Sequence, residues 1–334
     1  MKHSELVRTA ARLMEAQEPF LVTGPPGGGK TAGLVQACAV AKRRCLISHP
    51  VVSEEVDYRG LPGFIRKGQE EELRAVFLPF GFLRDLCETD EPTTCIFDDV
   101  GQARLSVQAA LMQLIHLREV DGTKISDTVS FAMATNRRED RAAVTGFVSA
   151  LLDRCVCVLP LDFDADELAK YLIKKGYPTI LAGFIRWKPN SVRFESKDEF
   201  VKCPTPRSIE GLARMLALGM DSTELVTASV GPSFASEFLS FRKLEGKLPS
   251  VADILAKPKT TKVPEERDVL YALMASLAGK LEAKNIAPGL DYLERVPPEF
   301  AVMVMKDVVE KVPDVEEVPA FVKWARANAK LLGV

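Results

Sequence analysis

The sequence predicts an α/β fold: a three-layer αβα domain with a parallel sheet, followed by helical regions. Between residues 20 and 160, short apolar runs alternate with stretches of helical apolar spacing. Such alternation is typical of right-handed β-α-β units, whose helices cover both faces of a parallel sheet. A glycine-rich segment directly follows the first apolar run, and strand signals become rare beyond Pro160.

Apolar spacing places the elements of this first half. Strands are expected at residues 20–22, 44–48, 94–97, 129–134 and 156–159, and helices at residues 31–42 and 102–117. Residues 59–77 favour a β-hairpin. Residues 120–130 favour a second one, with Asp121 and Gly122 as its turn.

The second half has mainly helical spacing. Helices are expected at residues 164–174, 207–218, 233–244, 265–284 and 318–332. Residues 192–195 could form one short strand, and the proline- and lysine-rich residues 257–264 are expected to be a linker.

The composition indicates an ordinary globular protein and excludes several classes. Of the 334 residues, 47% are hydrophobic and 27% are charged, with a net charge of −2. This charge gives no bulk attraction to nucleic acid or to an anionic membrane. No apolar run approaches the roughly 18 residues of a membrane span. The first residues read as an amphipathic helix start and not as a signal peptide, so a cytoplasmic location is expected.

The cysteines give no sign of a metal site or a disulfide framework. The seven cysteines contain no C-x-x-C pair, and the chain has only three scattered histidines. Cys155 and Cys157 are expected to share one face of a strand as buried free thiols.

The glycine-rich segment has the complete pattern G-x-x-x-x-G-K-[ST]. Backbone N–H groups of such a turn point into one concavity and cradle phosphates, and the following helix adds its N-terminal dipole. Lys30 is expected to reach the β- and γ-phosphates, and the Thr31 hydroxyl to hold Mg²⁺. The predicted cradle consists of Gly24, Pro25, Pro26, Gly27, Gly28, Gly29, Lys30 and Thr31. The sequence therefore predicts a nucleoside triphosphate site.

Two later strands end on polar residues that suit the same site. The apolar run 94–97 is followed by Asp98 and Asp99, and the run beginning at Val129 leads to Asn136. Asp98 is expected to hold Mg²⁺ through water, and Asp99 to orient or deprotonate the water that attacks the γ-phosphate. Asn136 could donate a hydrogen bond to the γ-phosphate or to that water.

The order and spacing of these motifs resemble those of the AAA+ ATPases, and within them the MoxR-like branch, which is related to magnesium-chelatase-type motors. The resemblance covers residues 20–218, with Walker A at residues 24–31, Walker B at residues 95–99 and sensor 1 at Asn136. Arg154, in the run Ser-Ala-Leu-Leu-Asp-Arg, stands where that family carries an arginine finger. Arg207, in Cys-Pro-Thr-Pro-Arg-Ser, resembles sensor 2.

The resemblance implies a ring, commonly a homo-hexamer, with Mg-ATP bound between subunits. Arg154 would act in trans and Arg207 in cis; Arg137, Arg138 and Arg141 compete for the trans role. Residues 1–160 would form the nucleotide-binding domain, residues 161–225 an α-helical lid, and residues 226–334 a helical C-terminal extension. The two hairpins would face the pore or a client, or else be passive surface loops.

ATP hydrolysis that remodels or assembles a protein partner is the function this resemblance implies. Family members commonly work with a von Willebrand factor A-type protein. A nucleic-acid motor or loader is an alternative, but Arg59, Arg66 and Lys67 in the first hairpin are soon followed by Glu70, Glu71 and Glu72. An ATP-gated scaffold with weak hydrolysis is a third possibility, because Asp99 stands where the family usually has glutamate.

Overall fold

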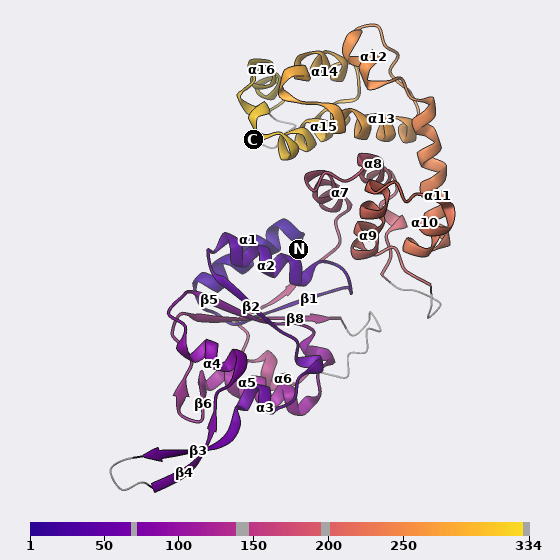
Figure 1. The fold of residues 1–334 in the computed structure, drawn as a ribbon. Helices are drawn as coiled ribbons and strands as arrows, with labels where there is room; N and C mark the ends of the chain where they lie inside the picture. The colour runs from indigo at the N-terminus through magenta and orange to yellow at the C-terminus, as the bar shows by residue number, and fades with distance from the viewer. Residues whose placement is uncertain (68–71, 138–146, 195–200, 330–334) are drawn as a thin grey trace. The chain divides into compact units, whose positions relative to one another are not determined.

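The structure is a computed structural model, and it describes residues 1–67, 72–137, 147–194 and 201–329 (Figure 1). The chain forms two compact units, Met1–Phe163 and Asp164–Val334. The first unit therefore ends close to the predicted boundary at residue 160.

A five-stranded parallel sheet forms the centre of the first unit. Its strands are β1 (Phe20–Gly24), β2 (Arg44–Ser48), β5 (Thr93–Phe97), β8 (Val129–Asn136) and β9 (Val158–Pro160), in the spatial order β2-β5-β8-β1-β9. These strands confirm the predicted α/β class and overlap all five predicted strands, although β9 begins at Val158 and not at Val156 as predicted. Gly24 pairs with Asn136 in the register of β1 and β8, so two predicted site residues lie side by side at the carboxyl edge.

Helices cover both faces of this sheet. The helices α1 (His3–Glu15) and α2 (Lys30–Val40) lie on one face, and α3 (Val56–Arg59), α4 (Gly81–Glu88), α5 (Leu105–Leu117) and α6 (Ser149–Leu152) on the other (Figure 1). Phe131 and Met133 of β8 join the core under α5, while Ala132 and Ala134 join the core under α1 and α2. The strand β8 is buried on both faces, and this explains the uninterrupted apolar run at its residues 131–134.

Cys155 and Cys157 differ from their prediction in two respects. Cys155 packs against the core beneath α5, whereas Cys157 packs against the core beneath α1 and α2. The prediction that they share one strand face is wrong, because β9 begins only at Val158. All seven cysteines are free thiols, but Cys155 and Cys157 are only partly buried, so the prediction that these two are buried is also wrong.

Both predicted hairpins are present. The strands β3 (Leu61–Lys67) and β4 (Glu72–Leu78) form a long antiparallel pair that projects from the first unit (Figure 1). Glu70 and Glu71 lie outside the described residues. The strands β6 (Glu119–Val120) and β7 (Thr123–Lys124) form a short pair, and their turn has positive φ at Asp121 and Gly122. Short 3-10 helices η1 (Pro50–Val52) and η2 (Val100–Gln102) follow β2 and β5.

The described part of the second unit is helical. Its helices are α7 (Ala165–Lys174), α8 (Thr179–Trp187), α9 (Pro206–Ala217), α10 (Thr223–Val230), α11 (Pro232–Arg242), α12 (Val251–Ala256), α13 (Arg267–Lys280), α14 (Ile286–Leu293), α15 (Pro298–Lys311) and α16 (Pro319–Ala327), with 3-10 turns at η4 (Pro189–Ser191), η5 (Lys243–Lys247), η6 (Ala283–Asn285) and η7 (Pro313–Glu317). They confirm the predicted helical second half. The expected strand at 192–195 is wrong for its described residues, 192–194, which follow η4 as irregular chain.

Two boundaries in the second unit can be compared with expectation. Residues 257–264 contain no regular helix or strand, in agreement with the predicted linker. The expected lid boundary between residues 225 and 226 falls inside α10. Among the described residues, no helix combines the length and the apolar character that a membrane crossing requires.

Candidate phosphate-binding site

The loop between β1 and α2 has the backbone that a phosphate cradle requires. Gly27 and Gly29 have φ values of 70° and 96°, a left-handed conformation that glycine adopts without steric cost. At Gly24, a Cβ atom would lie 2.9 Å from the carbonyl oxygen of Leu161, so a side chain there would collide with backbone. The loop then runs into the first turn of α2, where free N–H groups and the helix dipole favour an anion.

Lys30 is buried beneath this loop, with 6% of its surface exposed. Its ammonium donates to the carbonyl oxygens of Gly24 and Pro25, each at 3.0 Å, and to Oδ1 of Asn136 at 2.6 Å. The structure thus brings together the predicted phosphate lysine and the predicted sensor. Lys30 would exchange some of these bonds for phosphate oxygens when a nucleotide binds.

Thr31 and Asp98, the two residues predicted to hold Mg²⁺, are joined by a hydrogen bond. The Thr31 hydroxyl donates to Oδ2 of Asp98 at 2.7 Å. Asp98 follows β5, and its own backbone N–H donates to the carbonyl oxygen of Ser48 at the end of β2 at 2.9 Å. A hydroxyl and a carboxylate are hard oxygen donors, which Mg²⁺ prefers.

The chemistry of the donor set fits a cation that arrives with its substrate. In the described part of the chain, no group of three or more His, Cys, Asp or Glu side chains gathers to hold a metal. Mg²⁺ binds with one or two protein oxygens and completes its shell with phosphates and water. Thr31 and Asp98 supply that number.

Asp99 and Asn136 complete the polar chain. The amide nitrogen of Asn136 donates to Oδ1 of Asp99 at 3.4 Å, while its Oδ1 accepts from Lys30. The orientation of this amide is therefore fixed by a cation on one side and a carboxylate on the other. Asp99 has φ 57° and ψ 34°, in the left-handed region.

The predicted trans arginine, Arg154, is not among these hydrogen-bonded residues. Arg154 follows α6, in the helical layer on the sheet face opposite α2, and its Nη1 donates to the carbonyl oxygen of Ala150 at 3.0 Å. It lines a surface depression of about 440 Å³ together with Arg59, Met112 and His116.

Arg207 lies in the second unit, at the start of α9. That helix begins at Pro206, after the cap Thr205, whose hydroxyl accepts the N–H of Ser208 at 3.2 Å. Its role at the phosphate loop stays a prediction. Arg137 follows β8 directly, while Arg138 and Arg141 lie outside the described residues.

Sequence reasoning missed two residues beside the site. The Thr135 hydroxyl accepts the N–H of Gly101 at 3.2 Å and so fixes the turn after Asp99. The imidazole of His3 lies against α2, since a Cβ at Gly33 would be 3.2 Å from its Nε2. The position of Thr135 directly before Asn136 could have indicated the first. Nothing in the sequence indicates the second, because the contact joins two separate helices.

Comparisons with known proteins give only distant similarity. No protein-family model matches the chain, and no curated protein matches it.

Solved structures give weak matches. The chain is similar to RuvB of Thermotoga maritima, described as a Holliday junction branch migration motor, at 15% identity and a TM-score of 0.40, over 82% of this chain and 86% of that one. A point mutant of the same RuvB matches at 17% identity and a TM-score of 0.43, over 82% of this chain and 80% of that one. NtrX from Brucella abortus in complex with ADP matches at 14% identity and a TM-score of 0.39, over 99% and 68%. Similarity at this level supports no statement about the function of this chain.

Proposed function

We propose that this chain is an AAA+ ATPase that binds Mg-ATP at residues 24–31 and hydrolyses it. The observation that carries the proposal is the connected polar chain at the carboxyl edge of the sheet. Lys30, Asn136 and Asp99 are joined by hydrogen bonds, with the Thr31–Asp98 pair beside them. Ligands of parallel α/β sheets bind outside the carboxyl ends of the strands, where these residues lie.

Each residue has a task that its position supports. Lys30 would neutralise the β- and γ-phosphates, while Thr31 and Asp98 would hold Mg²⁺, which bridges phosphate oxygens and offsets their charge. Asp99 would orient the attacking water and accept its proton. Asn136 holds the Asp99 carboxylate in place by a hydrogen bond. Its bond with Lys30 would change when the γ-phosphate binds to that lysine.

An intersubunit site is the second part of the proposal. Arg154 belongs to the helical layer opposite α2, where it is partly exposed and lines the surface depression described above. A side chain so placed suits contact with a neighbouring copy, where it would stabilise charge on the transferring γ-phosphate. We therefore propose a ring, most simply a homo-hexamer, that couples hydrolysis to remodelling or assembly of a protein partner, as in the MoxR-like branch. A von Willebrand factor A-type protein is the partner class proposed.

Mixing two inactive variants tests the shared site. Asp99→Asn would remove the water-orienting carboxylate from one subunit, and Arg154→Ala would remove the trans arginine from its neighbour. Each variant alone should be inactive, while an equimolar mixture should regain about a quarter of the wild-type rate, since about a quarter of ring interfaces then join two intact halves. The matched control mixes Lys30→Ala with Asp99→Asn, which both lie on the cis side, and should stay inactive.

The same assay separates the other functions. A mixture of Asp99→Asn and Arg154→Ala that assembles but stays inactive contradicts the shared site. Wild-type turnover that DNA stimulates, with steep salt dependence, would favour a nucleic-acid motor instead. Assembly that needs ATP but proceeds without turnover would favour the scaffold.

A further inference from the structure

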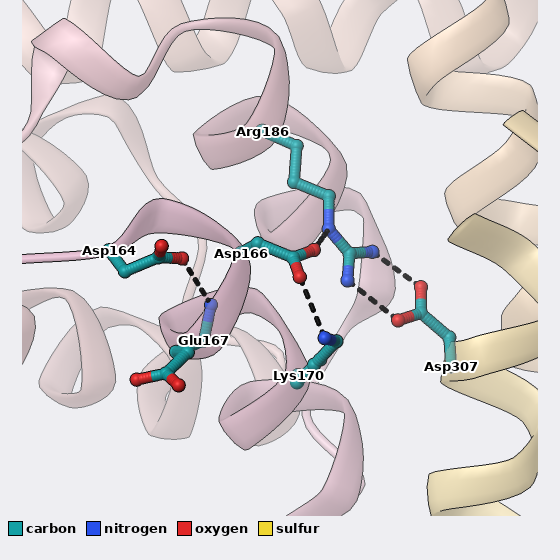
Figure 2. Close-up of polar contacts among 6 residues, drawn as sticks. All are labelled: Asp164, Asp166, Glu167, Lys170, Arg186 and Asp307. Carbon is teal, nitrogen blue, oxygen red and sulfur yellow. Dashed lines mark hydrogen bonds and ion pairs between the residues drawn. The ribbon is translucent and has the colours of Figure 1, made fainter. Parts of the chain in front are cut away.

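A buried ion pair joins α8 to α15 in the second unit (Figure 2). Arg186 of α8 donates from Nη2 to Oδ1 of Asp307 at 2.6 Å, and its Nη1 donates to Oδ2 of the same carboxylate. The two side chains are 5% and 1% exposed. The Nε of Arg186 also donates to Asp166 of α7 at 2.8 Å, and Lys170 bonds to the other oxygen of Asp166 at 2.7 Å. One guanidinium therefore ties three helices together.

The charges of this pair are compensated within the fold. Burial raises the pKa of Asp307, and the bonds from Arg186 oppose this effect. Burial also acts to lower the pKa of Arg186, but Asp307 and Asp166 raise it on balance, so the guanidinium stays charged. Apolar side chains would fill such an interface at lower desolvation cost. What a two-pronged Arg–carboxylate pair adds is a fixed mutual orientation of the helices that carry it.

Close backbone packing supports the same junction. A Cβ atom at Gly183 of α8 would lie 2.7 Å from Cβ of Ala275 and 3.0 Å from the carbonyl oxygen of Tyr271, both on α13. A Cβ atom at Gly279 of α13 would lie 3.0 Å from Oγ1 of Thr179 on α8. A Cβ atom at Gly183 would therefore collide with α13, and one at Gly279 would crowd Thr179, so glycine at both positions suits the close approach of the two helices.

The helices joined in this way come from both sides of the expected lid boundary at residue 225. The helices α7 and α8 precede it, whereas α13 and α15 follow it. An outer pair repeats the link, since Lys174 of α7 lies 3.1 Å from Glu310 of α15.

We infer that α7, α8, α13 and α15 form one rigid body, so that the C-terminal helices move with the lid as a lever and not as a separate domain. Arg186 and Asp307 are positioning residues of this lever. The inference rests on the proposed function only for the cause of the motion, which would be the nucleotide cycle. The rigidity itself is a property of the second unit and needs no nucleotide.

Hydrogen–deuterium exchange on the unaltered full chain, without nucleotide, tests the rigidity. With rising denaturant, peptides from α8, α13 and α15 should lose protection at the same denaturant concentration, since one cooperative unit opens as a whole. Loss of protection in α13 and α15 while α8 stays protected would overturn the inference.

A variant sharpens the test. Asp307→Asn keeps the side-chain shape but weakens the pair, and exchange should rise at least about 10-fold in α8 and α15 together. The matched control is Glu88→Gln, which weakens the exposed pair of Glu88 with Arg84 in the first unit and should change neither helix. Faster exchange confined to α15 would again overturn the inference. If Asp307→Asn does not fold, the denaturant series on the unaltered chain decides. A chain that bound no nucleotide would contradict the proposed function and leave these results standing.

Discussion

The backbone at Asp99 lies in the left-handed region, and this conformation bears on which carboxylate can stand there. Aspartate and asparagine adopt this region more readily than other non-glycine residues, for most of which it costs about 1–2 kcal/mol. The resemblance to AAA+ ATPases leads one to expect glutamate at this position. The turn after β5 gives a physical reason for aspartate: it suits the backbone, and Asn136 holds its short side chain.

Two substitutions at Asp99 distinguish the effect of its carboxylate charge from the effect of its backbone conformation. Asp99→Asn suits the same turn, so nucleotide binding and thermal stability should be kept while hydrolysis falls about 10²- to 10⁴-fold, the usual effect of losing a general base. Asp99→Glu keeps the charge but displaces it and strains the turn, so hydrolysis should fall about 100-fold. ATP turnover and the Kd for a fluorescent ADP analogue check both. Wild-type turnover in Asp99→Asn would remove Asp99 from the mechanism.

Cysteine reactivity gives a second test at this scale. A hydrogen bond with Cys38 lowers the pKa of Cys45, which is half-buried, while the same bond and burial raise the pKa of Cys38. Burial raises the pKa of Cys155 to about 12. Because the thiolate is the reactive form, iodoacetamide at pH 8 should label Cys45 before Cys38 and Cys155. Mass spectrometry of the digested protein gives the order in which the cysteines are labelled. Labelling of Cys155 before Cys45 would contradict the prediction.

The candidate residues of the site could be found in the sequence because they obey local rules. Lys30 and Thr31 belong to a contiguous motif, Asp98 and Asp99 follow a strand that the apolar pattern predicts, and Asn136 is the last residue of another strand. The bonds among them could not be predicted. The contact of Lys30 with Asn136 joins residues 106 positions apart, and only the pairing of β1 with β8 brings them together.

At the scale of elements, the two hairpins act as one structure. The carboxylate of Asp121, in the turn between β6 and β7, accepts the N–H of Phe77 in β4 at 2.6 Å. The guanidinium of Arg59 lies over the ring of Phe77, 5.6 Å from its centroid. The turn itself was predictable, since Asp-Gly favours positive φ at both positions. The hydrogen bond between Asp121 and Phe77, which clamps the two hairpins together, could not be predicted, because its partners are 44 positions apart and in different hairpins.

Substitution of Asp121 tests this clamp. Asp121→Ala should speed hydrogen exchange in residues 72–78, since both the acceptor of the Phe77 N–H and a residue suited to the turn are lost. Asp121→Asn is the matched variant, because it keeps the turn preference and an acceptor oxygen and should stay close to wild type. Exchange by mass spectrometry measures both. Equal protection in Asp121→Ala and wild type would show that the long hairpin needs no support from the short one.

At the scale of the whole molecule, the two expected boundaries differ in their origin. The change from alternating strands to helices near residue 160 matches the division after Phe163, because each side builds its own core from local elements. The expected boundary at residue 225 came from the family resemblance and not from a local signal, and α10 runs across it. Among the contacts that join the regions on either side is the pair Arg186–Asp307, whose residues are 121 positions apart, and no sequence pattern predicts it.

Two truncated fragments, one ending at each expected boundary, should differ in stability. A fragment that ends at Phe163 keeps the complete parallel sheet with both of its helical layers, so it should be soluble and unfold cooperatively. A fragment that ends at residue 225 loses α13 and α15, which leaves the buried guanidinium of Arg186 without Asp307. It also loses α11, so Phe184 is stripped of its ring contacts with Phe234, Phe238 and Phe241.

The fragment that ends at residue 225 also exposes the apolar side chains of α8 that the missing helices bury, at about 25 cal/mol for each Å² of apolar surface, and a domain is stable by only about 5–15 kcal/mol. The longer fragment should therefore aggregate or carry an unfolded tail, even though it contains more of the chain than the shorter one. Solubility and thermal unfolding followed by circular dichroism compare the two. A soluble fragment of residues 1–225 whose α7, α8 and α9 melt cooperatively would show that these helices fold without the C-terminal ones and would restore the three-part division.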